Sequence, residues 1–196
     1  DLVRFDTAAR WCLRFVGWSP AMAAEPLDSA RDNAPVRVAY LKIHDPEYPR
    51  NRRVSEYLGV ERNDDFTVQL WGRRGFAWSV RDAIAMFRAG RESDVLLLAE
   101  FQLKHAALAK FAALVYRRLL VVDCFVMRYE TEVGDWQRVR PGSAKAYALT
   151  AIDRIALRVA DIVLTDTEVR ARRLREMVPA RTEVVSLPVG APAELT

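Results

Sequence analysis

The chain has 196 residues, 51% of them hydrophobic, and its 30 basic and 26 acidic side chains give a net charge of +4. This length and composition suffice for one large domain with a packed core and exclude an intrinsically disordered chain. The two cysteines are too few for a disulfide framework and lack metal-ligand spacing, and no apolar run reaches the roughly 18 residues that span a bilayer.

The segment 1–34 stands apart as a helical extension followed by a linker. Residues 2–18 predict a helix to which Trp11, Phe15 and Trp18 add aromatic weight among several arginines. Such a helix suits peripheral contact with a membrane, packing on the domain's own surface, or a place in an upstream domain, and the sequence leaves these alternatives open. Because the chain begins with Asp1 and shows no signal peptide, we expect a piece of a longer cytoplasmic protein, at the inner face of the membrane under the first alternative.

From residue 36 onwards, strand-like and helix-like patterns alternate. Continuous apolar runs, typical of strands buried on both faces, predict six strands. They cover 36–43, 66–71, 94–101, 119–125, 161–166 and 182–188. Helical patterns are predicted over 51–60, 79–89, 104–118, 143–160 and 168–178.

Local sequence signals add three expectations about helix ends, a buried helix face and a loop. Gly90 is expected to stop the helix that begins at 79. Ser143 is expected to cap the helix that runs to 160, with Ala148 and Ile155 among the residues on its inner side. The polar stretch 127–142 is expected to be a loop.

Alternating helices and buried strands indicate a parallel sheet covered by helices. We therefore expect an α/β fold with an open, doubly wound, mostly parallel, Rossmann-like sheet over 35–192, preceded by the helical extension and followed by a hinge or tail at 193–196. In such sheets, ligands bind outside the carboxyl ends of the strands, where the strand order reverses. Right-handed crossovers place that point between the strands at 36–43 and 94–101.

The loop HDPEYPRNRR at 44–53 follows the first strand and is therefore expected at this crevice. Asp45 and Tyr48 offer hydrogen bonds to hydroxyl groups. Arg50, Asn51 and Arg52 stand where the next helix begins, and backbone N–H groups there favour anions. The sequence predicts a rigid, basic loop for an anionic or hydroxyl-rich ligand, against the alternative of a turn whose arginines are merely solvated. Replacing both Arg50 and Arg52 with alanine is then expected to reduce turnover without unfolding the protein.

Further polar side chains follow the ends of the other strands, at the same edge of the predicted sheet. They are Glu100, Lys104, His105, Asp123, Asp166 and Thr167. His105 is a candidate general base near neutral pH, against the alternative of a helix-start residue without a role. Asp166 and Thr167 are also explained as the N-cap of the helix that follows them.

Several familiar motifs are missing from the sequence. It contains no G-x-G-x-x-G after the first strand, no G-x-x-x-x-G-K-[ST] and no G-x-S-x-G, which argues against a dinucleotide site, a P-loop and an α/β-hydrolase. The two histidines lack metal-ligand partners and no Asp-x-Asp occurs, so no metal is expected.

Residues 36–192 resemble the N-terminal domain of a GT-B glycosyltransferase of the large retaining family 4, or group 1. The most specific part is 152–177, IDRIALRVADIVLTDTEVRARRLREM, which is similar to the family's helix with a final Ala-Asp, strand ending in Thr or Ser, and next helix. The stretch TEVVSLPVGAP resembles the family's last strand and hinge, with Val189 in place of the usual asparagine. The segment 121–131 falls where the family presents an acceptor-site loop.

The resemblance implies a hexosyltransferase-like enzyme of polysaccharide biosynthesis that transfers a sugar from a nucleotide-sugar donor to a glycan or lipid-linked acceptor, without metal, cofactor or nucleic acid. It implies that this domain binds the acceptor, that a C-terminal domain absent from the sequence binds the donor, and that the piece alone is inactive. The family's first loop is often glycine-rich and touches the donor diphosphate. Here the loop at 44–53 has no glycine, so its arginines replace that contact or the loop serves the acceptor.

The implied acceptor pocket would be lined by Glu100, His105 and Asp123, with Asp123 or His105 as the base in an inverting enzyme. Because a fold does not fix a function, two alternatives stay open. One is a non-catalytic α/β module that binds a sugar, a nucleotide or a protein. The other is the acceptor half of a two-chain glycosyltransferase.

Overall fold

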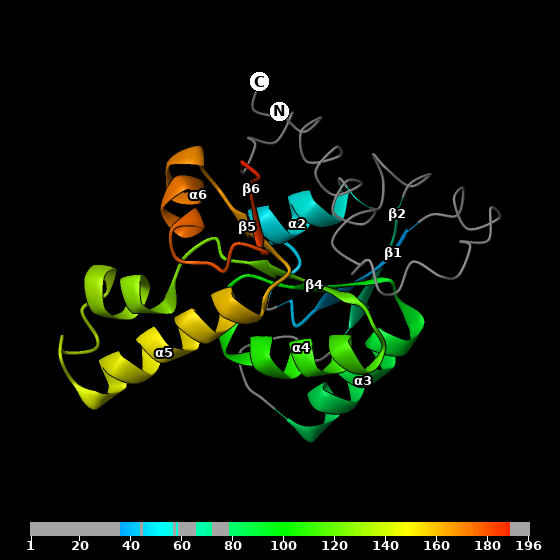
Figure 1. Cartoon of the computed structure of the whole chain (residues 1–196), viewed down its shortest axis with the longest axis horizontal. Coiled ribbons are helices and arrows are strands. Elements are labelled where there is room, and N and C mark those ends of the chain that lie inside the picture. The colour runs from blue at the N-terminus through cyan, green and yellow to red at the C-terminus, as the bar shows by residue number, and fades with distance from the viewer. Residues whose placement is uncertain (1–35, 44, 57, 59–65, 72–78, 189–196) are drawn as a thin grey trace.

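A computed structural model describes residues 36–43, 45–56, 58, 66–71 and 79–188 of the chain. The predictions for the N-terminal extension, its membrane contact and the hinge lie outside the described residues. Within them, the chain forms one six-stranded, all-parallel sheet with the order β2-β1-β3-β4-β5-β6 (Figure 1). This confirms the predicted α/β, Rossmann-like fold class.

The strands are short and apolar, and they alternate with helices along the chain. The strands are β1 (Val36–Leu41), β2 (Phe66–Trp71), β3 (Val95–Leu98), β4 (Leu119–Asp123), β5 (Ile162–Thr165) and β6 (Glu183–Ser186). The helices are α2 (Pro49–Glu56), α3 (Val80–Glu92), α4 (Ala106–Val115), α5 (Ala144–Val159) and α6 (Glu168–Arg175), with the short turns η4 (Leu103–His105) and η5 (Glu130–Asp135).

Side-chain alternation along the strands divides the core between the two faces of the sheet. Val38 and Tyr40 of β1 belong to one apolar cluster, together with Val54 of α2. Ala39 and Leu41 of the same strand belong to the other, which also takes in residues of α3, α4, α5 and α6. Right-handed crossovers require this division, because only the β1-to-β2 connection runs toward the β2 edge of the sheet.

The strand order reverses between β1 and β3, as the sequence predicted. β1 pairs with β2 on one side and with β3 on the other. The carboxyl ends of β1 and β3 therefore flank the position where open α/β sheets bind their ligands.

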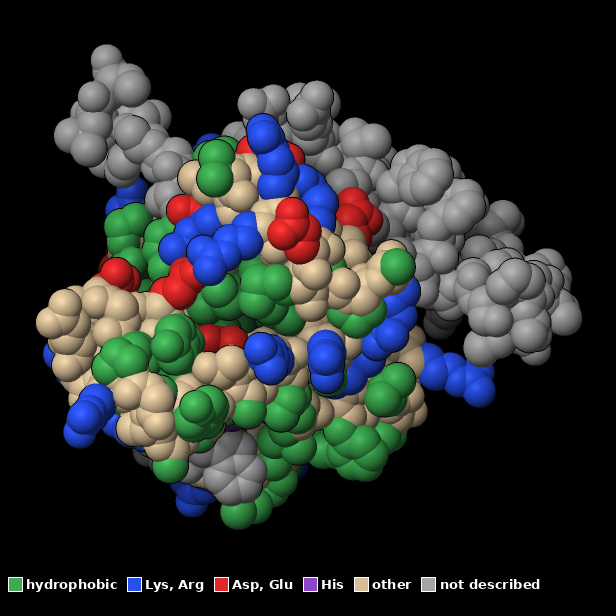
Figure 2. Space-filling view, turned by 60° about the vertical axis from the view of Figure 1, so that its left-hand side comes forward, with side chains coloured by type: hydrophobic (Ala, Val, Ile, Leu, Met, Phe, Trp, Pro, Cys, Tyr) green, Lys and Arg blue, Asp and Glu red, His purple; other side chains and the backbone are tan. Residues whose placement is uncertain are grey.

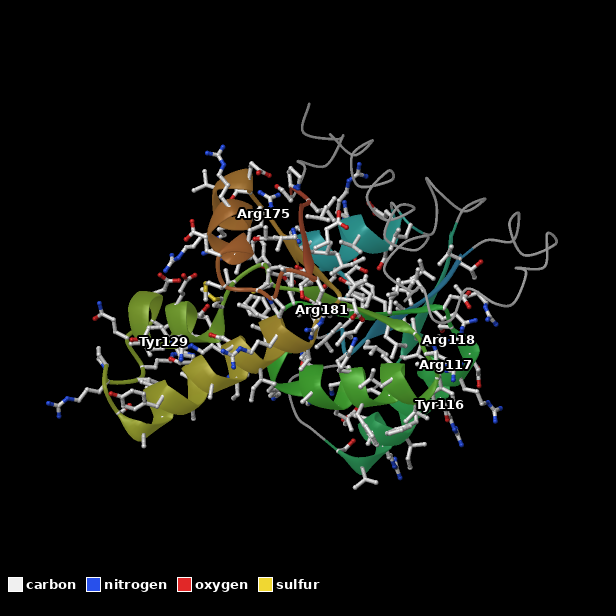
Figure 3. All side chains as sticks on the ribbon, in the orientation of Figure 1. Tyr116, Arg117, Arg118, Tyr129, Arg175 and Arg181 are labelled. Carbon is white, nitrogen blue, oxygen red and sulfur yellow. The ribbon has the colours of Figure 1, made fainter. Side chains whose placement is uncertain are left out.

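Helix α3 continues past Gly90 to Glu92, so the prediction that Gly90 stops the helix is wrong. The glycine is needed for close approach between helices instead. A Cβ atom there would lie 2.8 Å from Cδ2 of Tyr116 and 3.3 Å from the carbonyl oxygen of Ala112. Tyr116 lies beside α3 at the C-terminal end of α4 (Figure 3). Gly90 thus lets α3 and α4 pack against each other at short distance.

Replacing Gly90 with alanine is expected to lower the free energy of unfolding by about 1 kcal/mol, because the cost of overpacking exceeds the helix propensity that alanine gains. Gly134→Ala is the matched control, since nothing lies within 4 Å of the Cβ it would add. Urea unfolding of both variants measures the difference. Equal effects of the two substitutions would contradict the packing role of Gly90.

Two other expectations are wrong. The stretch 127–142 is not simply a loop, because it contains η5. In α5, Ala148 and Ile155 point to solvent, and the buried face instead includes Asp153 and Ala156. The Asp153 carboxylate accepts hydrogen bonds from the backbone N–H groups of Arg128 and Tyr129, at 3.2 and 2.9 Å, so a buried acid marks the inner side.

The structure confirms the predicted N-caps of α5 and α6. Ser143 accepts a hydrogen bond from the N–H of Ala146 at the start of α5. Thr167 caps α6 in the same way, through the N–H of Arg170. Each cap satisfies one of the N–H groups that the first turn of a helix leaves without an intrahelical partner.

Candidate functional site

The carboxyl ends of β1, β3 and β4 bring together a group of buried charged side chains. Lys42 follows β1, Glu100 follows β3, and Asp123 ends β4, and each is at most 1% exposed. Lys42 and Phe101 also have positive φ angles, of 61° and 59°. For side chains other than glycine this conformation is strained, and such strain is concentrated at functional sites.

Arg50 and Asp123 form a buried ion pair at the centre of this group. Arg50 Nε donates to Asp123 Oδ2 at 2.7 Å, and Nη1 donates to the carbonyl oxygen of Leu187 at 2.9 Å. The guanidinium carbon lies 5.0 Å from the ring centroid of Phe125. Arg50 therefore ties the start of α2 to the ends of β4 and β6. The expectation that its removal leaves the fold intact is not supported by this burial.

Electrostatics keep the Arg50 side chain charged. Burial alone would lower the pKa of its guanidinium, but the charge and the hydrogen bond of Asp123 outweigh burial and raise that pKa. Burial raises the pKa of the Asp123 carboxyl, and Arg50 opposes this rise. Two atoms of the pair, Arg50 Nη2 and Asp123 Oδ1, are buried without a hydrogen-bond partner among the described residues.

Asn51 fixes the loop that connects β1 to α2. Its Oδ1 accepts a hydrogen bond from the Tyr40 hydroxyl at 2.9 Å, and its Nδ2 donates to the backbone carbonyl of Asp45 at 2.8 Å. Asp45 Oδ1 in turn accepts from the N–H of Glu47 at 3.0 Å. In this structure Asn51 and the Asp45 carboxylate are occupied in shaping the loop.

Tyr48 and Arg52 lie nearer the surface. The Tyr48 ring meets the ring of Phe101 edge-to-face, with 6.2 Å between centroids, so the loops after β1 and β3 are in contact. Arg52 is exposed and pairs with Glu56, one turn further along α2, at 3.2 Å. The buried cluster of Arg50, Glu100 and Asp123 therefore does not extend to Arg52.

Glu100 differs from its neighbours because neither of its oxygens has a hydrogen-bond partner among the described residues. Its side chain is fully buried. Burial, and secondarily the charge of Asp123, raise the pKa of Glu100 to about 8, while Arg50 opposes the shift. The carboxyl is therefore largely protonated at neutral pH, where it can donate as well as accept a hydrogen bond.

A second buried ion pair lies on the α3 side of the sheet. Lys42 Nζ is 3.3 Å from Oδ2 of Asp82 in the first turn of α3, and both side chains are 1% exposed. The Ser79 hydroxyl donates to the same Asp82 oxygen at 2.8 Å. The charges of Lys42 and Asp82 both act on His105, which places the three side chains in one neighbourhood.

His105 is buried, and its Nε2 has no hydrogen-bond partner among the described residues. Burial and the charges of Lys104 and Lys42 lower the pKa of His105 to about 4. The neighbouring Lys104 reaches solvent, and partial burial of its side chain, together with the charges of Arg128 and Lys42, lowers its pKa. At neutral pH His105 is therefore an uncharged imidazole and a weak base, unlike the near-neutral base expected from the sequence.

Asp166 and Thr167 lie at the end of β5. Thr167 is the N-cap of α6, which agrees with the capping interpretation for this residue. Asp166 Oδ1 accepts hydrogen bonds from the hydroxyls of Thr165 and Thr167, at 3.3 and 3.4 Å. The Asp166 charge also acts on Asp123, so this acid stands at the border of the buried cluster.

The structure thus gathers Arg50, Glu100 and Asp123, leaves Arg52 outside, and assigns loop-forming contacts to Asn51. Whether any of them contacts a ligand stays a prediction. Sequence reasoning missed four residues of the site. Tyr40 and Phe125 contact Asn51 and Arg50, and Lys42 and Asp82 form the second buried ion pair. Lys42 and Tyr40 carried a signal, because a lysine at the end of an apolar strand and a tyrosine within it both need a buried polar partner.

Within the described ranges, no group of three or more His, Cys, Asp or Glu side chains is placed to hold a metal ion. No helix in that same part of the chain is long and apolar enough to cross a membrane. No family model matches the sequence, and no curated protein matches it.

Proposed function

We propose that this domain binds the hydroxyl groups of a saccharide acceptor at the β1–β3 switch point, as the acceptor-side domain of a glycosyltransferase that uses a nucleotide-sugar donor. The observation that carries the proposal is the set of buried polar atoms without partners among the described residues. Around the Arg50–Asp123 pair these atoms are Arg50 Nη2, Asp123 Oδ1 and both carboxyl oxygens of Glu100. Such atoms are costly unless a ligand or water meets them.

The charge balance of the cluster favours a neutral ligand over a phosphate. The positive charge of Arg50 is already paired with Asp123 at 2.7 Å. Glu100 adds either no charge or a negative one, so an additional anion would find no net attraction there. A sugar hydroxyl both donates and accepts, and it can therefore meet an arginine nitrogen and a carboxylate oxygen at once. This supports the acceptor, rather than the donor diphosphate, as the ligand of the loop after β1.

The roles that follow are mainly positioning. Glu100 and Asp123 would hold acceptor hydroxyls, and Arg50 would hold Asp123 in place while offering Nη2 to the same ligand. In the transfer reaction, a fixed acceptor hydroxyl close to the anomeric carbon of the donor supplies much of the rate enhancement. If the enzyme inverts the anomeric centre, Asp123 is the candidate base, because burial raises the pKa of its carboxyl above the ordinary value. The pKa of His105 is instead lowered to about 4, by burial and by the charges of Lys104, Lys42 and Arg128.

Saccharide binding by the isotope-labelled chain tests this proposal. Neutral mono- and disaccharides are expected to shift the amide resonances of Glu100, Phe101 and Asp123, whereas uridine diphosphate is not. Glu100→Ala is expected to weaken saccharide binding about tenfold, because a lost hydrogen bond costs roughly 1.4 kcal/mol. Arg52→Ala is the control, since Arg52 is exposed and outside the cluster.

Two outcomes would contradict the proposal: saccharides that leave these resonances unmoved, or uridine diphosphate that shifts them. A positive result still allows a non-catalytic saccharide-binding module. Transfer from a nucleotide-sugar to the saccharide that binds, assayed in a protein that carries the donor-binding domain, separates the enzyme from such a module.

A further inference from the structure

Strand β2 forms one edge of the described sheet and has the composition of a strand that pairs with another chain. Within the described residues it pairs only with β1. Its sequence, FTVQLW, contains no charged residue and no proline, and Leu70 is 58% exposed. Edge strands usually carry charges, prolines or bulges that prevent pairing with other chains. β2 lacks the first two of these protections.

The register shows which backbone groups of β2 face away from β1. The carbonyl oxygen of Trp71 accepts a hydrogen bond from the N–H of Lys42, at 2.9 Å, so the backbone groups of Trp71 point toward β1. The N–H and C=O of one residue in a strand point the same way, and alternate residues point in opposite directions. The backbone groups of Val68 and Leu70 therefore point outward, at the edge.

An apolar groove of about 760 Å³ lies next to this edge. It runs along α3 and is lined mainly by Trp71 of β2, by Ile84, Phe87, Arg88 and Arg91 of α3, and by Tyr116, which directly follows α4. A second hollow of about 340 Å³ shares Trp71, Ile84 and Arg88 with it and adds Arg81. Figure 1 places α3 and α4 side by side at the lower edge of the molecule, and Figure 2 shows hydrophobic and basic side chains together on the lower part of its face.

The charges around the groove have one predominant sign. Arg81, Arg88 and Arg91 of α3 are exposed there, against a single acid, Glu92. An occupant that buries apolar side chains in the groove therefore gains most if it also carries acidic groups.

We propose that β2 and the adjacent groove bind an extended acidic segment of a partner protein, which adds to the sheet as a further strand. Its backbone would pair with the outward N–H and C=O groups of Val68 and Leu70. Alternate side chains of an added strand fall on one face of the sheet, so every second residue would enter the groove beside α3. Acidic residues of the segment would meet Arg88 and Arg91.

Two other occupants fit these observations less well. A second copy of the chain paired edge to edge across a two-fold axis would bring the basic α3 helices of both copies onto the same face, where they repel each other. A lipid surface offers no backbone groups to pair with β2, and an open sheet edge is costly in contact with lipid.

The test uses two short synthetic peptides of β2 length. On the face that would meet the groove, one peptide alternates valine with glutamate and the other alternates valine with lysine, and in both peptides the residues of the opposite face are threonine. The isotope-labelled chain is expected to bind the glutamate peptide at least tenfold more tightly, with slower hydrogen exchange at the amides of Val68 and Leu70. In the double variant Arg88→Glu/Arg91→Glu the preference should reverse. Both arginines are exposed on α3, so this variant is expected to fold.

A matched pair of variants at Leu70 tests the backbone pairing. Leu70→Pro removes one outward N–H without removing a hydrogen bond to β1, whereas Leu70→Thr keeps that N–H and loses a comparable apolar area. Binding of the glutamate peptide should be lost in the first and kept in the second. Equal binding by both Leu70 variants would overturn the proposal. So would the absence of any peptide binding, concentration-dependent dimerisation through β2 in sedimentation experiments, or binding to anionic vesicles in place of the peptide.

Discussion

Asp123→Ala is expected to lower the free energy of unfolding by about 3–5 kcal/mol, because it leaves the buried guanidinium of Arg50 without its counter-charge. Arg50 is 2% exposed and Asp123 is 1% exposed, so solvent screens the unpaired guanidinium only weakly. The other polar contact of Arg50, to the carbonyl oxygen of Leu187, is too weak to compensate for a missing carboxylate. Urea unfolding at pH 7, followed by circular dichroism, measures the loss.

Two variants show whether the loss comes from an uncompensated charge. Arg50→Met/Asp123→Leu replaces the pair by apolar side chains of similar size and should recover much of the stability, since buried pairs often contribute little net stabilisation over apolar packing. Arg52→Ala removes an exposed arginine that pairs only across one turn of α2 with Glu56, and such pairs contribute about 0.5 kcal/mol or less. If Asp123→Ala costs no more than Arg52→Ala, the pair is not essential to the fold.

The contrast between Arg50 and Arg52 also shows what the sequence could and could not predict. Continuous apolar runs such as that of β1 predicted the parallel sheet and the reversal of strand order, because buried strands must be apolar on both faces. The direction in which an arginine of α2 points depends on a partner 73 residues away, Asp123, and no local pattern encodes that distance.

The errors in α3 and α5 have the same origin. Glycine favours the end of a helix by local preference, yet at Gly90 the close approach of Tyr116, at the end of α4, outweighs that preference. A hydrophobic-periodicity pattern assigns Asp153 to the solvent face of its helix because it is polar. It is buried because its carboxylate accepts hydrogen bonds from the N–H groups of Arg128 and Tyr129. In each case a tertiary contact with a distant residue decided the outcome, whereas the local caps at Ser143 and Thr167 could be read from the sequence.

Glu100 is expected to make the protein less stable as the pH rises from 6.5 to 8. Its pKa is about 8 in the folded protein, whereas the ordinary value for a glutamate is 4.5. Over most of this interval the Glu100 carboxyl therefore holds a proton in the folded state that it has released in the unfolded state. The stabilisation from the protonated carboxyl is complete below the unfolded pKa and is lost as the pH rises through the folded one. One proton corresponds to a slope of roughly 1.4 kcal/mol per pH unit, or about 2 kcal/mol over the interval.

His105 has the opposite effect on the pH dependence of stability, mainly at lower pH. Its pKa falls from 6.5 to about 4 on folding, so the unfolded state binds the additional proton between these values and stability rises with pH there. Above pH 6.5 that contribution fades as the unfolded histidine loses its remaining proton, and since His105 is the same in every variant, comparison between variants isolates the effect of Glu100.

Glu100→Gln should abolish most of the slope between pH 6.5 and 8, because the amide does not titrate. Glu92→Gln, at an exposed glutamate of α3, should leave the slope as it is in the parent chain. The measurement is the free energy of unfolding of all three proteins at several pH values in this interval, from which the three slopes are compared. An unchanged slope in Glu100→Gln would mean that the carboxyl is ionised in the folded protein. The hydrogen bond that Glu100 offers to an acceptor hydroxyl would then have to come from a carboxylate, which accepts but cannot donate.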